Sequence, residues 1–112
     1  IMKKSLIECC EYYFKVFSAK NLEELSKLFA DDIELRDWEN FSSGKSNVVL
    51  TNKKIFDNVE SINVKPKNIY QDGNVIIAEL DILINGKEKI LVVDIIRFNE
   101  SAKICRINAF KG

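Results

Sequence analysis

Residues 90–98 read Ile90-Leu91-Val92-Val93-Asp94-Ile95-Ile96-Arg97-Phe98 and predict a β-strand. Both faces of this strand are mostly apolar, which is typical of a strand in the middle of a sheet that is covered on both sides. Side chains alternate between faces along a strand, so Asp94 shares its face with apolar side chains only. An ionised carboxylate is costly to bury there, so Asp94 has to be paired, hydrogen-bonded or protonated.

A second acid occupies the same kind of position. Asp37 ends the run Ile33-Glu34-Leu35-Arg36-Asp37 and shares its face with Ile33 and Leu35. Two acids on two apolar strand faces indicate a lined pocket rather than a plain hydrophobic core.

The rest of the sequence predicts helices and strands in the order ααβαββββ. Asn21 is a good N-cap for the second helix, and Glu24 completes a capping-box-like pattern. The single proline, Pro66, predicts an edge strand or a bulge, and Asn85-Gly86 predicts a hairpin turn. The expected helices cover residues 4–19, residues 21 to about 30, and residues 46–59; the expected strands cover residues 33–38, 62–70, 75–84, 87–98 and 103–110, and residues 40–44 are expected to be a loop.

This order predicts an α+β domain in which helices pack on one face of a curved antiparallel sheet. The 112 residues are enough for a single domain with its own core, and we expect that domain to span residues 2–112. Ile1 precedes Met2, so we expect Met2 to be the natural first residue.

Charge and composition argue against several classes of function. Lys+Arg and Asp+Glu are equal at 17 each, without the concentrated positive patch that binds nucleic acid or an anionic membrane. No apolar segment reaches the ~20 residues of a membrane span, and no signal peptide is visible. Nucleotide-binding motifs such as G-x-G-x-x-G are absent, so we expect no cofactor. Because a positive patch and a membrane span are also missing, we expect neither nucleic acid nor a membrane as a partner.

Histidine is absent, which excludes Ser-His-Asp and Cys-His catalysis and the usual zinc sites. We expect no metal, because Asp31-Asp32 is better explained as acids at a helix end. Acid–base chemistry then falls to carboxylates, tyrosines or lysines. Cys9, Cys10 and Cys105 are odd in number and contain no C-x-x-C, which is typical of reduced cysteines in a cytoplasmic protein.

The helical spacing of apolar residues in the first helix directs Tyr13 inward, where its hydroxyl needs a partner. In a sheet that curls over the helices, Tyr13, Asp37 and Asp94 could all point into one cup. An ionised Asp can take a proton from a carbon next to a carbonyl, while a Tyr hydroxyl and a protonated Asp stabilise the enolate oxygen that forms. The expected ligand is a small, mainly apolar carbonyl compound.

Asn52 is the polar exception on the apolar stripe of the third helix, beside Val48, Ile55 and Val59. Two interpretations remain open from the sequence. The Asn52 side chain either forms a hydrogen bond that fixes the helix, or it contacts or supports a ligand.

The chain resembles the nuclear transport factor 2-like (NTF2-like) superfamily, which includes the SnoaL-like polyketide cyclases and the ketosteroid isomerases. The resemblance covers nearly the whole chain and is carried by residues 29–37, by Gly44 before the third helix, and by residues 93–98 followed by a turn and Lys103-Ile104. It implies a cone of three helices wrapped by a strongly bent sheet, often a homodimer through the sheet.

The resemblance also implies roles for the three candidate catalytic residues. In the isomerase pattern Asp37 corresponds to the general base, and Tyr13 and a protonated Asp94 to the oxyanion-hole donors. Trp38 replaces the proline that follows the base in the isomerases, and Phe29 and Asn52 stand where supporting tyrosines are expected. The residues expected to line the pocket are Asn52, Trp38, Phe17, Phe56 and Phe29.

Two functions follow as hypotheses. The first is a cofactor-free isomerase, cyclase or lyase that transfers a proton through Asp37. The alternative is a non-catalytic module that binds a small molecule or forms a homodimer, because function depends on sites rather than on folds.

Overall fold

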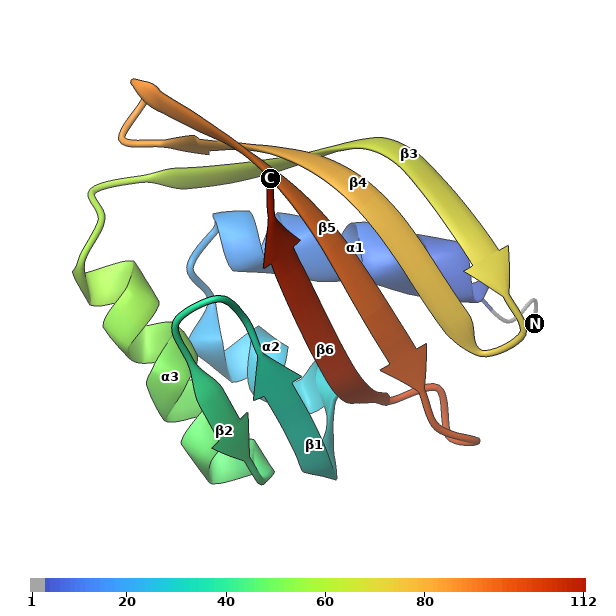
Figure 1. Cartoon of the computed structure of the whole chain (residues 1–112). Helices are drawn as coiled ribbons and strands as arrows, with labels where there is room; N and C mark the ends of the chain where they lie inside the picture. Colours follow the sequence, from blue (N-terminus) through green and yellow to red (C-terminus); the bar gives the residue numbers. More distant parts are fainter. Residues whose placement is uncertain (1–3) are drawn as a thin grey trace.

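The computed structural model describes residues 4–112, which form three helices beside one curved sheet (Figure 1). The expectations for Ile1 and Met2 at the chain start lie outside these described residues. The helices are α1 (Leu6–Ser18), α2 (Leu22–Leu28) and α3 (Lys45–Asp57), and the strands are β1 (Phe29–Arg36), β2 (Phe41–Ser43), β3 (Ile62–Asp72), β4 (Val75–Ile84), β5 (Glu88–Phe98) and β6 (Ile104–Lys111).

The predicted α+β class is confirmed, with two local differences. Helix α2 ends at Leu28 and strand β1 begins directly at Phe29, so the strand starts earlier than expected. Residues 41–43, expected to be loop, form β2, which pairs antiparallel with β1. A strand of three residues with two serines is too short to show an alternating pattern.

The helix starts follow local hydrogen bonding. Ser5 and Glu8 form a complete capping box at α1. The predicted cap of α2 is confirmed, since Asn21 Oδ1 accepts from Glu24 N at 3.1 Å. The Glu24 carboxylate, however, accepts from the Tyr12 hydroxyl at 3.1 Å rather than closing the box.

The sheet has the strand order β2-β1-β6-β5-β4-β3 and does not close on itself. Strands β3 to β6 form the expected antiparallel meander, but β1 pairs parallel with β6, so the sheet is mixed. The prediction for Pro66 is confirmed in both forms, because β3 is an edge strand and its register shifts between Pro66 and Asn68. A residue without an N–H is tolerated at such a place.

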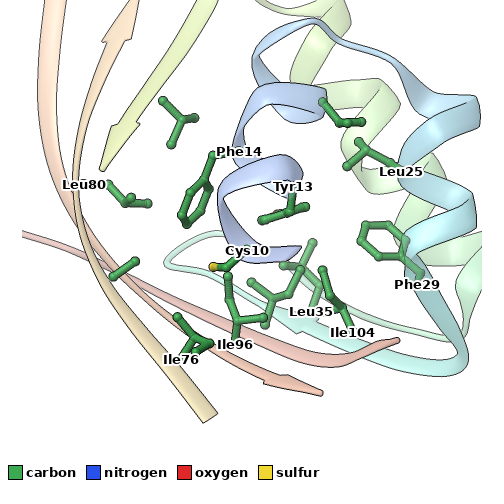
Figure 2. Packing of buried hydrophobic residues seen from close by; sticks show 14 of the residues in the cluster. Cys10, Tyr13, Phe14, Leu25, Phe29, Leu35, Ile76, Leu80, Ile96 and Ile104 are labelled. Carbon is green, nitrogen blue, oxygen red and sulfur yellow. The ribbon is translucent and has the colours of Figure 1, made fainter. Parts of the chain in front are cut away.

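The inner face of the sheet packs against α1, and the core is densely filled at one end. There Ile76, Ile96 and Ile107 are cross-strand neighbours and are fully buried. Figure 2 shows Ile76 and Ile96 beside Cys10 of α1. The next row along the strands contains Asp94 and two alanines. The short alanine side chains leave room for a cavity beside Asp94.

Lys20 connects two helices. It follows α1 with a positive φ of 56°, and its Nζ donates to the carbonyls of Phe56, Val59 and Glu60 at 3.1, 2.6 and 3.0 Å. Phe56 lies in the last turn of α3, and Val59 and Glu60 follow the helix directly. The helix dipole favours a cation at this end. Lys20 therefore fixes the end of α3 against the α1–α2 connection.

Candidate functional site

A cavity of about 270 Å³ lies between α1, α3, the loop after β1 and the inner face of the sheet. Most of its wall is aliphatic and comes from strands β3, β4 and β5 and the end of α3. Six of the sequence-predicted site residues line it: Tyr13, Phe17, Asp37, Trp38, Asn52 and Asp94.

Asp94 lies in the middle of β5 and is only 7% exposed. Its neighbours on the adjacent strands are Ala78 and Ala109, whose short side chains leave the carboxyl uncovered on the inner face. No hydrogen bond joins the Asp94 carboxyl to another side chain or backbone group of residues 4–112. Burial, and secondly the nearby charge of Asp37, raise the pKa of Asp94 to about 7.

Tyr13 lies on the inward face of α1, as its helical position predicts, and its ring packs among Phe14, Phe17 and Phe29. Figure 2 shows the ring among the buried side chains between α1 and α2. Burial, followed by the charge of Asp94, raises the pKa of Tyr13 well above its usual value. Its hydroxyl is therefore a hydrogen-bond donor, and within the described chain it donates to no protein group.

Asp37 is half-buried at the cavity wall and is held by its own loop. Its Oδ1 accepts from the backbone N–H groups of Glu39 and Asn40 at 2.8 and 2.6 Å. The Asn40 side-chain amide lies 3.1 Å from both carboxylate oxygens. These bonds fix the direction of the carboxylate, and they occupy part of the lone-pair capacity that a general base would use.

Asn52 projects from the buried face of α3 and is 2% exposed. Its Nδ2 has no hydrogen-bond partner in the described part of the protein. The structure therefore shows no hydrogen bond through which the Nδ2 of Asn52 could fix its helix. An unpaired buried amide costs about 1–3 kcal/mol, so the group needs another explanation.

The expectation that Phe29 and Phe56 line the pocket is corrected by the structure. Both residues lie one layer behind the wall, where Phe29 packs 6.3 Å from the Tyr13 ring and Phe56 packs 4.9 Å from the Phe17 ring, measured between centroids. Helical and strand periodicity identifies a buried side chain but does not distinguish the cavity wall from the layer behind it.

Sequence reasoning missed three features of the site. The two alanines beside Asp94 depend on strand register, and Asn40 depends on the loop that follows β1. Glu39 joins Asp37 and Asp94 at the cavity, while none of the lining residues in the described range 4–112 is basic. The cavity lining is therefore mainly apolar, with three acids and the three asparagines Asn40, Asn52 and Asn58.

Residues 4–112 contain no group of three or more His, Cys, Asp or Glu side chains placed to hold a metal ion. None of their helices is long and apolar enough to cross a membrane.

Comparison with known families decides the membership of the chain. The sequence pattern of the SnoaL-like domain family matches residues 10–107, which is most of the chain. The chain belongs to the SnoaL-like domain family. The predicted membership in the NTF2-like superfamily is thereby confirmed. No curated protein matches the chain.

Solved structures show the same SnoaL-like fold at low sequence identity. A candidate SnoaL-like polyketide cyclase from Shewanella denitrificans has a TM-score of 0.85 at 12% identity, covering 96% of this chain and 90% of that one. A candidate isomerase of the SnoaL-like family from Agrobacterium tumefaciens has a TM-score of 0.83 at 10% identity, covering 95% and 96%. A candidate ketosteroid isomerase from Kribbella flavida has a TM-score of 0.78 at 15% identity, covering 94% and 76%.

In this SnoaL-like domain, α1, α3 and β5 each supply one polar group to the cavity, and the loop after β1 supplies the carboxylates of Asp37 and Glu39. The Tyr13 hydroxyl and a protonated Asp94 are hydrogen-bond donors suited to a carbonyl or enolate oxygen. Asp37 is the group of the set that could accept a proton from a ligand.

Proposed function

We propose that the protein binds a compact, uncharged carbonyl compound and transfers a proton next to the carbonyl. The observation that carries this proposal is the pair Tyr13 and Asp94. Both groups are buried at an apolar cavity, and neither has a hydrogen-bond partner in residues 4–112. Buried polar groups are normally paired, so an unpaired pair at a cavity is best explained by a ligand oxygen.

The cavity supports a particular kind of ligand. Its volume of about 270 Å³ is just below the roughly 300–1,000 Å³ of sites for drug-sized ligands, which favours a compact molecule over a steroid. The acids Asp37 and Glu39 would repel a carboxylate or phosphate group, and the lining within the described residues offers no cation to hold one.

In the proposed reaction, the Asp37 carboxylate takes a proton from the carbon next to the ligand carbonyl. The C–H electron pair moves to the carbonyl oxygen and gives an enolate, which accepts hydrogen bonds from Tyr13 and protonated Asp94. When a carbon–carbon double bond adjoins the carbon that lost the proton, the enolate is a dienolate. Asp37 then returns the proton to the far end of that double bond, the C=C shifts into conjugation with the carbonyl, and an isomerisation is complete. Names such as isomerase and cyclase among the structural relatives support this class of chemistry.

A non-catalytic binding module is the second candidate function, and one observation favours it. The Asp37 carboxylate accepts hydrogen bonds from Glu39 and Asn40, which explains its position without any role as a base. In this case the cavity binds the same kind of ligand but does not change it.

We further propose that residues 2–112 act as one domain, that the domain forms a homodimer through the outer face of its sheet, and that it is located in the cytoplasm. The outer face exposes apolar side chains that a second copy would cover; they include Leu83, Leu91, Val93 and Phe110. The free cysteines Cys9, Cys10 and Cys105 support a reducing compartment.

Deuterium exchange tests the proton transfer without knowledge of the natural substrate. We would follow exchange of the acidic carbon-bound protons of 2-tetralone in D₂O by NMR. The wild-type protein should accelerate this exchange, and Asp37→Asn should reduce the acceleration by about 10²–10⁴-fold, the usual contribution of a general base.

Exchange that is equally fast with Asp37→Asn would contradict the role of Asp37. Binding of 2-tetralone without any acceleration by the wild-type protein would favour the non-catalytic module.

A further inference from the structure

Asn52 is a buried polar group that the proposed proton transfer does not use. It lies on the apolar stripe of α3 between Val48 and Phe56, which are buried one turn before and one turn after it. An apolar residue would pack there without loss, whereas the unpaired Nδ2 lowers stability. An asparagine at position 52 therefore lowers the stability of the fold, and a role in ligand binding would explain it.

The amide is independent of the Tyr13–Asp94 pair. Asn52 reaches the cavity from α3, while Tyr13 comes from α1 and Asp94 from β5. Within residues 4–112, no hydrogen bond joins the Asn52 side chain to either of them. The Asn52 Nδ2 itself is enclosed. The oxygen and nitrogen of a carboxamide are nearly equal in shape, so a half-turn of the Asn52 amide presents Nδ2 to the cavity, where a ligand oxygen bound by Tyr13 and Asp94 would leave it available for a second atom.

We infer that Asn52 forms a second polar subsite, which donates a hydrogen bond to a second oxygen of the ligand. This inference rests on the proposed function, since it assumes a ligand whose first oxygen lies at Tyr13 and Asp94. The ligand class becomes narrower as a result: a compact, uncharged compound with two acceptor oxygens, one the reacting carbonyl and the other a carbonyl, ether or hydroxyl oxygen.

The proposed contact with the second oxygen would make the site selective for ligands that have this oxygen. A site with a buried donor discriminates against a ligand that lacks the matching acceptor, because the donor then remains unpaired. The wall near Asn52 includes the aliphatic side chains Ile55 and Val59, and Asn58 lies after the end of α3. Asn52 is the buried polar group of the helix itself that would distinguish oxygen from carbon at this place.

Matched pairs of phenols test the inference. Methoxy-2-naphthols, substituted at different ring positions, would be compared with the ethyl-2-naphthols of the same shape, and 2-naphthol itself would serve as the reference. In the wild-type protein at least one methoxy isomer should bind about 2–10-fold more tightly than its ethyl counterpart, which is the net value of one hydrogen bond. Asn52→Leu should abolish this preference.

Stability provides the readout that separates binding from a structural role. Asn52→Leu should keep or raise the melting temperature, since it removes an unpaired buried amide. A clear fall in melting temperature would mean that Asn52 has a structural hydrogen bond, and it would overturn the inference.

NMR of the wild-type protein keeps the test independent of the variant. The Asn52 side-chain amide protons should shift downfield with the preferred methoxy compound and not with its ethyl counterpart. If 2-naphthol binds through Tyr13 and Asp94 but every methoxy–ethyl pair binds equally, the Asn52 inference is wrong and the proposed function stands. If no naphthol binds at all, both are wrong.

Discussion

At the residue scale, Asp94 has the environment that matters most for the account. Its neighbours Ala78 and Ala109 are too short to cover it, and no protein group within residues 4–112 donates to it. Burial therefore acts on the carboxyl without compensation, and the pKa of Asp94 rises from 3.8 to about 7. Near neutral pH this group is partly protonated, so it can donate a hydrogen bond to a ligand oxygen.

The raised pKa of Asp94 predicts how stability depends on pH. Between pH 3.8 and about 7 the folded protein holds a proton that the unfolded chain has lost, so stability falls as pH rises through this range. Asp94→Asn should remove this loss. We expect the variant to unfold in urea with a free energy higher by on the order of a few kcal/mol at pH 8, and little changed at pH 4.

The matched control is Asp72→Asn at the exposed end of β3, which should leave the pH dependence unchanged. An Asp94→Asn variant that is less stable than the wild type at pH 8 would show that the ionised carboxylate stabilises the fold, against the account.

The sequence predicts part of the site at this scale. Strand alternation and helical spacing bring Asp94 and Tyr13 inward, because both periods are local properties of the chain. The hydrogen bonds from Asn40 to Asp37 depend on a loop conformation that has no such period. The position of Phe29 behind the wall depends on the packing of α1 against its neighbours, which periodicity does not contain.

At the element scale, Lys20 holds the end of α3, and the neighbouring residues Asn58 and Val59 line the cavity. Lys20→Met removes three hydrogen bonds from an ammonium group to backbone carbonyls. We expect the free energy of unfolding to fall by about 1.5–3 kcal/mol, the range for hydrogen bonds to a charged group, as measured by chemical denaturation.

Lys54→Met is the matched control, because Lys54 is an exposed cation in the last turn of the same helix. Its effect should stay within about 0.5 kcal/mol. Equal effects of the two substitutions would show that Lys20 acts only as a surface charge near the helix end.

Helices and strands with a clear hydrophobic period were predictable from the sequence, but the pairing of strands far apart in the chain was not. The meander of β3 to β6 follows from alternation and turn signals such as Asn85-Gly86. The parallel pairing of β1 with β6 joins segments far apart in the chain. Alternation shows which face of a strand is buried, but it does not identify the strand beside it.

At the scale of the whole molecule, the open sheet leaves an apolar outer face, and the proposed homodimer would bury it. Leu91 on β5 is 53% exposed, and Leu50 on the outside of α3 is 54% exposed. Leu91→Lys should shift the protein from dimer to monomer in analytical ultracentrifugation, because a charge on a buried apolar interface is costly. Leu50→Lys should leave the dimer unchanged. Identical behaviour of the two variants would contradict an interface on the sheet.

A cavity lies within the cone, and Tyr13, Asp94 and Asn52 line it. The central claim is that Tyr13 and Asp94 together bind a ligand oxygen there. Its most direct test is a fluorescence titration with 2-naphthol, whose ionised form resembles an enolate, using the wild type, Tyr13→Phe, Asp94→Ala and Asp37→Asn.

We expect the wild type to bind 2-naphthol with the signal of the naphtholate. Tyr13→Phe and Asp94→Ala should each weaken binding by about tenfold or more, since each removes a hydrogen bond to a charged oxygen. Asp37→Asn should bind at least as tightly as the wild type, because it removes a nearby negative charge. Absence of binding, or binding that is indifferent to all three substitutions, would contradict the claim.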